Sequence, residues 1–158
     1  MTNSKTKLLS VILIFFCTTS FSQTVKTIDS SEFQYQACLD KGQFMIDCSN
    51  HFYSQMDSLL NVQYKKLRSK CDSVQKVNLK NDQQKWLAVR DKQFKFNKQQ
   101  VNKDAKDNGY NGGQDEVMIL MDKNAKFVKD RVIELINQTP DSYSAKKYKS
   151  KTYKVSTE

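Results

Sequence analysis

The chain has 158 residues, with 26 Lys and Arg against 17 Asp and Glu, so its formal net charge is +9. This length accommodates one domain and excludes a multidomain enzyme. With 4 Gly and 1 Pro, the sequence has too few turn-forming residues for a β-sandwich or a barrel. Lys, Gln, Leu and Asp are abundant, and helices accept all of them. The composition therefore predicts an all-α fold, a small antiparallel bundle of three to four helices.

The first 22 residues have the features of a secretory signal peptide. Lys5 and Lys7 form a basic start, residues 8–16 are almost wholly apolar, and small residues precede a cleavage site before Gln23. The apolar run is about half of the ~20 residues that a membrane-spanning helix requires. We therefore expect a cleaved signal, and a mature chain without a transmembrane span.

Export places the predicted mature chain in the periplasm or outside the cell. Cys17 suggests lipid attachment, but Phe16 stands where lipidation sites need a small residue, which argues against a lipoprotein. An exported protein does not meet DNA or RNA, so its positive charge does not predict a nucleic-acid partner. Disulfides, in contrast, become permissible.

Three cysteines remain after residue 22, and an odd number leaves one thiol over or makes an intermolecular bond. Cys38 and Cys48 are ten residues apart with Gly42 between them, so we predict a disulfide between this pair. A loop this short stabilises the fold by roughly 2 to 3 kcal/mol. Cys71 is then the extra thiol. His51 is the sole histidine and no Cys-x-x-Cys spacing exists, so we expect no metal and no cofactor.

The first two predicted helices surround the cysteine pair. Residues 29–32 resemble a capping box and open a short helix that ends near Leu39. The second helix begins near Phe44, and its apolar residues recur at steps of three and four. These residues are Cys48, Phe52, Met56, Leu59, Leu60, Tyr64, Leu67 and Cys71. Asp72 and Ser73 end this helix.

Two further helices follow. The same spacing connects Leu79, Trp86, Leu87, Arg90, Phe94 and Val101 in a third helix, whose length allows an antiparallel return along the second. The pattern is lost over residues 102–113, where the glycines of 108–113 predict a loop. A fourth helix starts at Asp115 and Glu116, whose charges favour a helix N-terminus, and Pro140 ends it.

Residues 140–158 differ in composition from the rest of the chain. They contain five lysines and almost no aliphatic residues, which predicts a solvated, disordered basic tail or a tether for anionic envelope polymers. The predicted organisation is thus a signal at 1–22, a helical domain at 23–139 and a tail at 140–158. Of the nine positive charges, the signal carries two and the tail three, which leaves four on the domain.

Two motifs and a glycine loop in this order resemble the lysozyme inhibitor LprI-like N-terminal domain family, over roughly residues 33–136. The residues that carry the resemblance are Asp57, Asn61, Tyr64, Gln83, Trp86, Arg90, Asp91, Tyr110, Gly112, Gly113 and Arg131. The family has cysteines where this chain has Phe94 and Lys123, so a second disulfide expected from the resemblance is absent. Phe94 is on the apolar stripe and supplies packing in its place.

The motif residues have a structural and a recognition interpretation. Asp57, Asn61 and Tyr64 share one side of the second helix, and Trp86, Arg90 and Asp91 cluster on the third. In the structural interpretation, Arg90 pairs with Asp57 or Asp91, Asn61 bonds to backbone or to Tyr64, and Trp86 fills the core. These contacts hold the helices in register.

In the recognition interpretation, the glycine loop binds a partner. The resemblance implies inhibition of a lysozyme, an enzyme that cleaves sugar polymers with two carboxylates. Tyr110 beside Gly112 and Gly113 is the candidate anchor, with Lys103 or Lys106 as its charged neighbour.

Catalysis is not expected, because hydrolase, zinc-protease and phosphate-loop motifs are absent from the sequence. Two functions of different classes stay open. The first is non-covalent inhibition of lysozyme or another cell-wall hydrolase. The second is binding of an anionic envelope glycopolymer by a structural module without inhibitory activity. The net charge favours the second, because animal-type lysozymes are themselves basic and are repelled at long range.

Overall fold

The computed structural model describes residues 19–109 and 113–156, with side chains from residue 25 onward. The described residues form α2 (Thr19–Leu39), α3 (Met45–Ser69), α4 (Ser73–Asp107), α5 (Gln114–Asn137) and a 3-10 turn, η1 (Pro140–Tyr143). They contain no strand. This confirms the predicted all-α class. None of these helices is both long and apolar enough to cross a membrane.

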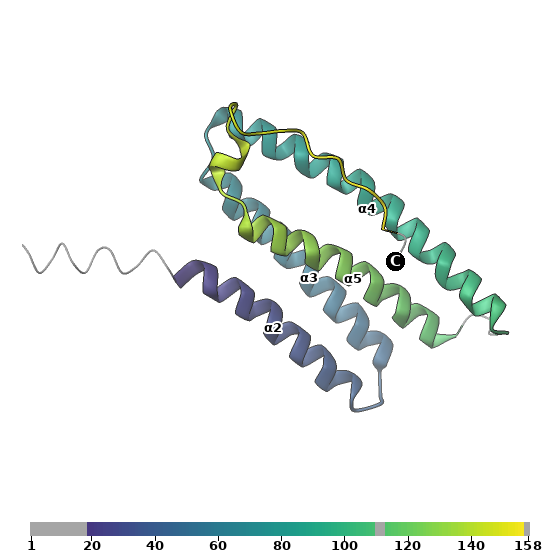
Figure 1. Ribbon diagram of the computed structural model, residues 1–158. Helices are drawn as coiled ribbons and strands as arrows, with labels where there is room; N and C mark the ends of the chain where they lie inside the picture. The colour runs from purple at the N-terminus through teal and green to yellow at the C-terminus, as the bar shows by residue number, and fades with distance from the viewer. Residues whose placement is uncertain (1–18, 110–112, 157–158) are drawn as a thin grey trace, which may run out of the picture.

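The helices run up and down along one another (Figure 1). α5 packs most extensively on α3 and also contacts α4 and α2, while α2 packs mainly on α3. α4 runs antiparallel to α3, as its length allowed, but packs chiefly against α5 and η1. The Asp40–Phe44 connection lies at the same end of the bundle as the C-terminus of α4 and the N-terminus of α5.

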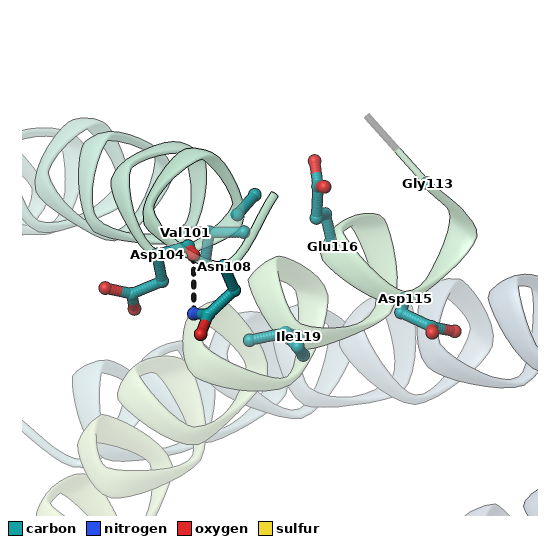
Figure 2. Close-up of a pocket in the computed structure, with 8 residues that line it drawn as sticks. Val101, Asp104, Asn108, Gly113, Asp115, Glu116 and Ile119 are labelled. Atoms are coloured by element: carbon teal, nitrogen blue, oxygen red, sulfur yellow. Dashed lines mark hydrogen bonds between the residues drawn. The ribbon is translucent and has the colours of Figure 1, made fainter. Parts of the chain in front are cut away.

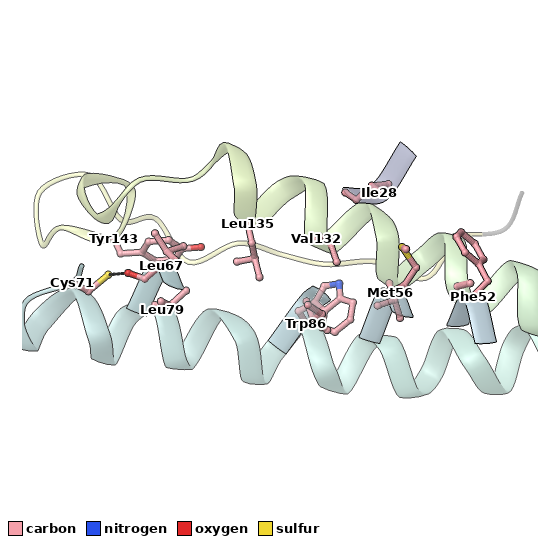
Figure 3. Close-up of a cluster of buried hydrophobic side chains, with 13 residues drawn as sticks. Ile28, Phe52, Met56, Leu67, Cys71, Leu79, Trp86, Val132, Leu135 and Tyr143 are labelled. Carbon is pink, nitrogen blue, oxygen red and sulfur yellow. Dashed lines mark hydrogen bonds between the residues drawn. The ribbon is translucent and has the colours of Figure 1, made fainter. Parts of the chain in front are cut away.

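One apolar core extends along the length of the bundle (Figure 3). Met56 and Leu79 are fully buried, and Trp86 is 3% exposed and stacks on Phe127 at a centroid distance of 5.6 Å. The other buried members are Ile28, Phe52, Leu60, Leu67, Cys71, Ala125, Val128, Val132, Leu135 and Tyr143. Burial of each large side chain contributes about 1.5 to 3 kcal/mol to folding, so this cluster is the main source of stability.

The cysteines are arranged as predicted. Cys38 at the end of α2 and Cys48 in α3 form a disulfide with a Cα–Cα distance of 5.9 Å. Cys71 is free and buried, and its thiol donates a hydrogen bond to the Leu67 carbonyl at 3.3 Å. Burial raises the pKa of this thiol, so the reactive thiolate is disfavoured. In this conformation Cys71 is not available for an intermolecular bond.

Two helices extend beyond the predicted bounds. α2 begins at Thr19 rather than near residue 29, and Ile28 is buried in the core at 3% exposure. Ile28 stands three residues before the buried Ser31, so the helical stripe continues upstream of the predicted cap. α4 continues to Asp107 because Ala105 is buried four residues after Val101. Its other end follows the Asp72 break and has a capping box between Asp72 and Gln75.

The end of the chain differs from the expected solvated tail. Residues 144–156, here called the C-terminal strap, run back along α4 after η1 (Figure 1). Tyr143 is 1% exposed, and the Asn78 side chain donates to its carbonyl at 2.9 Å. Further along the strap, Gln93 exchanges two hydrogen bonds with the backbone of Ser156. Tyrosine rings and backbone bonds attach this segment, although it contains few aliphatic residues.

Candidate functional site

The most completely bonded polar group in the described residues is buried between α4, α5 and the strap. Arg131 and Asp82 have fully buried side chains, and Nη2 of the arginine lies 2.7 Å from Oδ2 of the aspartate. Arg131 Nη1 donates to Glu134 at 2.6 Å and to the Tyr153 hydroxyl at 2.7 Å, while Nε and Nη2 donate to Gln83 at 3.2 and 3.0 Å. All five N–H donors of the guanidinium therefore have acceptors.

Two tyrosines complete this group, here called the Arg131 cluster. Tyr153 donates to Asp82 at 2.9 Å, and Tyr143 donates to the same carboxylate at 3.3 Å. Burial raises the pKa of both phenols, and the charge of Asp82 acts in the same direction. Burial opposes the charge on Arg131, but the hydrogen bond to Asp82 and the charge of Glu134 raise its pKa overall. These directions favour a charged Arg131 and neutral tyrosines, so the two phenols donate hydrogen bonds to Asp82.

Other motif residues lie beside this cluster. The Arg131 guanidinium is 5.8 Å from the centroid of the Trp86 ring, and the Arg90 guanidinium is 5.9 Å from it. Arg90 also pairs with Asp91 at 2.7 Å, one of the two partners considered from the sequence. The structure therefore brings Gln83, Trp86, Arg90 and Arg131 together at the α4–α5 contact.

Among the described residues, the motif residues of α3 form hydrogen bonds only within that helix. The Asn61 amide donates to the Asp57 carbonyl at 3.0 Å and to its carboxylate at 3.4 Å, four residues earlier on α3. Tyr64 is partly buried and packs against the core. These bonds within one helix turn do not link α3 to the Arg131 cluster, although the sequence placed all these residues in one possible network.

Several buried polar residues were not predicted. Asp82 stands three residues after Leu79 and four before Trp86, so it occupies the apolar stripe of α4, and this position is the signal that could have identified it. A second group joins the same two helices. Gln93 donates to Asn97 at 2.9 Å, and Asn97 donates to Asn124 at 2.9 Å. Both groups are satisfied internally, as buried polar groups must be.

The candidate recognition loop is described only in part. Tyr110 and Gly112 lie outside the described residues, and Gly113 is the exposed N-cap of α5. Lys103 and Lys106 are exposed near the C-terminus of α4. These two lysines and Gly113 therefore lie at the end of the bundle where α4 ends and α5 begins.

A pocket of about 340 Å³ lies between these two helix ends (Figure 2). Its apolar surface comes from Val101, Ala105 and Ile119, and its acidic groups are Asp104, Asp115 and Glu116. One carboxylate oxygen of Glu116 is buried without a hydrogen-bond partner among the described residues. Over residues 101–119 the sequence has four carboxylates against two lysines, so this end is acidic on a chain of net charge +9.

The polar features of the described residues divide into a buried ion pair and an exposed acidic pocket. The hydrogen-bonding groups of the buried ion pair are engaged by neighbouring side chains. The described residues contain no group of three potential metal ligands. The acidic pocket and the exposed Asp40–Phe44 connection lie at one end of the bundle (Figure 1).

The family model for lysozyme inhibitor LprI matches residues 36–135. The match covers more than half of the chain, which therefore belongs to the LprI family. It includes the disulfide, the whole of α3 and α4, and most of α5. Comparison with curated proteins and with solved structures gives no match.

Proposed function

We propose that this chain is an exported inhibitor that binds lysozyme or another cell-wall hydrolase without forming a covalent bond. The family match over residues 36–135 carries this proposal. The disulfide between Cys38 and Cys48 supports export, because such bonds persist in oxidising compartments. Removal of residues 1–22 would leave the described core intact, since Ile28 is the first buried residue of the described side chains.

We assign the interface to the end of the bundle that carries the pocket. Association of two basic proteins is slowed at long range, but complementary charge at the contact orients them. The carboxylates of Asp104, Asp115 and Glu116 supply this local complement to a basic hydrolase. Lys103 and Lys106 are exposed beside them and are suited to the hydrolase's catalytic carboxylates.

The test is a titration of hydrolase activity with purified residues 23–158. We expect loss of activity that reaches completion near equimolar inhibitor when the hydrolase concentration exceeds Kd, measured as clearance of a cell-wall suspension. The panel should include a basic and an acidic hydrolase, because the acidic pocket predicts stronger inhibition of the basic one. Full activity of every hydrolase at tenfold excess would exclude the proposal.

The alternative is binding of an anionic envelope glycopolymer, and the strap favours it by one observation. Lys146, Lys149 and Lys154 are exposed on a segment held along α4 rather than on a free tail. If this function is the correct one, replacement of all three by glutamine abolishes binding to isolated envelope and inhibition is absent. Moderate salt abolishes the same binding, because the contacts are exposed charges. Substitution is preferable to deletion, since the strap is part of the fold.

A further inference from the structure

Phe44 is the most exposed large apolar residue in the described part of the chain, at 78%. It is also the sole non-glycine residue there with a positive φ, at 54° with ψ 34°. The left-handed region is unfavourable for a bulky side chain, and residues held there against this preference cluster at functional sites. A buried side chain would repay this strain through packing, but the Phe44 ring faces solvent, so the core does not explain it.

The backbone around Phe44 is held on both sides. The disulfide between Cys38 and Cys48 closes a loop in which every residue from Asp40 to Phe44 is exposed. Within it, the Lys41 amide donates to the Cys38 carbonyl at 3.3 Å and the Gly42 amide donates to the Leu39 carbonyl at 2.9 Å. We call residues 40–44 the stapled loop. A loop fixed in advance loses less conformational entropy on binding than a flexible one.

The stapled loop contains two charged side chains, Asp40 and Lys41, and only the first is hydrogen-bonded within the described residues. The Gln36 amide donates to the Asp40 carboxylate at 2.9 Å. Lys41 is exposed, and no hydrogen bond or ion pair engages its ammonium among the described residues. The loop therefore presents one free positive charge and one aromatic ring, three residues apart.

We propose that the stapled loop enters the sugar-binding cleft of the hydrolase. This inference rests on the proposed function and names the segment that performs it. The Phe44 ring replaces the apolar face of a sugar ring, and the Lys41 ammonium pairs with one of the two carboxylates that such clefts use. Aromatic side chains, phenylalanine among them, are enriched at protein interfaces, which suits the Phe44 ring to the role of anchor. The acidic pocket at the same end of the bundle then contacts basic residues around the cleft.

The decisive variant is Phe44→Asn. Asparagine tolerates the left-handed region better than other non-glycine residues, so this change removes the ring without adding backbone strain. We expect inhibition to weaken at least tenfold while the melting temperature stays the same or rises. A matched control is Phe33→Ala, which removes a ring that is 75% exposed on α2 outside the loop and leaves inhibition unchanged. Lys41→Gln is expected to weaken inhibition at least threefold, with a smaller effect at high salt.

The possible outcomes separate the inference from the proposed function. Inhibition by the parent chain that persists unchanged in Phe44→Asn and Lys41→Gln overturns the inference and leaves the proposed function standing. Absence of inhibition by the parent chain overturns both. Sedimentation of the parent chain with anionic lipid vesicles, abolished by Phe44→Asn while inhibition is retained, would assign the loop to a membrane surface and also overturn the inference.

Discussion

Replacement of Arg131 by methionine is expected to lower the free energy of unfolding by about 3 to 5 kcal/mol. The arginine and Asp82 form a fully buried ion pair, and methionine would leave a buried carboxylate with only two tyrosine donors. The loss comes mainly from this uncompensated charge rather than from the pair's own attraction. Urea denaturation monitored by the single tryptophan, which contacts the cluster, measures the change directly.

Two further variants test this explanation. Arg90→Met breaks an ion pair whose aspartate is 67% exposed, so it should cost less than about 1 kcal/mol. The double variant Arg131→Met with Asp82→Leu removes both charges and should be more stable than Arg131→Met alone. Equal losses from Arg90→Met and Arg131→Met, or a double variant less stable than the single one, would contradict the buried-charge explanation.

Deletion of residues 140–158 is expected to have a comparable effect, a loss of about 3 kcal/mol or more. Removal of the buried Tyr143 ring alone forfeits about 1.5 to 3 kcal/mol. The deletion also removes the Tyr143 and Tyr153 hydroxyls, so the Asp82 carboxylate loses two of its hydrogen-bond donors. Thermal unfolding followed by circular dichroism should show a melting temperature lower by 10 °C or more for a domain of this size, by about 4 °C per kcal/mol.

The control for this deletion distinguishes loss of the strap's packing from loss of its positive charge as the cause of a lower melting temperature. A chain with Lys146 and Lys149 replaced by glutamine should melt like the parent, because both lysines are exposed. An unchanged melting temperature after deletion of 140–158 would show that the strap contributes nothing to the fold.

The sequence predicts those parts of the fold that depend on local periodicity. α3 was predicted to start near Phe44, and its buried residues follow the expected steps of three and four, because an amphipathic helix encodes its buried face in neighbouring residues. The disulfide was predictable for the same reason, since only ten residues separate its cysteines. The start of α2 differs from the prediction because a capping-box pattern also occurs inside a helix, and here Ile28 and Ser31 are buried on one face of α2 across it.

The candidate site was less predictable, since its contacts join distant parts of the chain. Asp82 and Arg131 are separated by 49 residues, and Tyr153 reaches Asp82 across 71. The composition predicts that residues 140–158 are too poor in aliphatic residues to pack. Two tyrosines are nevertheless sufficient to hold the segment on the bundle, because their hydroxyls donate hydrogen bonds to the buried Asp82 carboxylate. The exposed and strained state of Phe44 has no sequence signature, because phenylalanine normally indicates a buried position.

The position of the strap at the end of the chain determines when the Arg131 cluster can be completed during synthesis. Synthesis proceeds from the N-terminus, so the four helices emerge before the phenols of Tyr143 and Tyr153. Until these last residues arrive, the carboxylate of Asp82 lacks two of its donors and the central ion pair is open to water. The central ion pair therefore acquires its full set of hydrogen bonds only after the final segment of the chain has been synthesised.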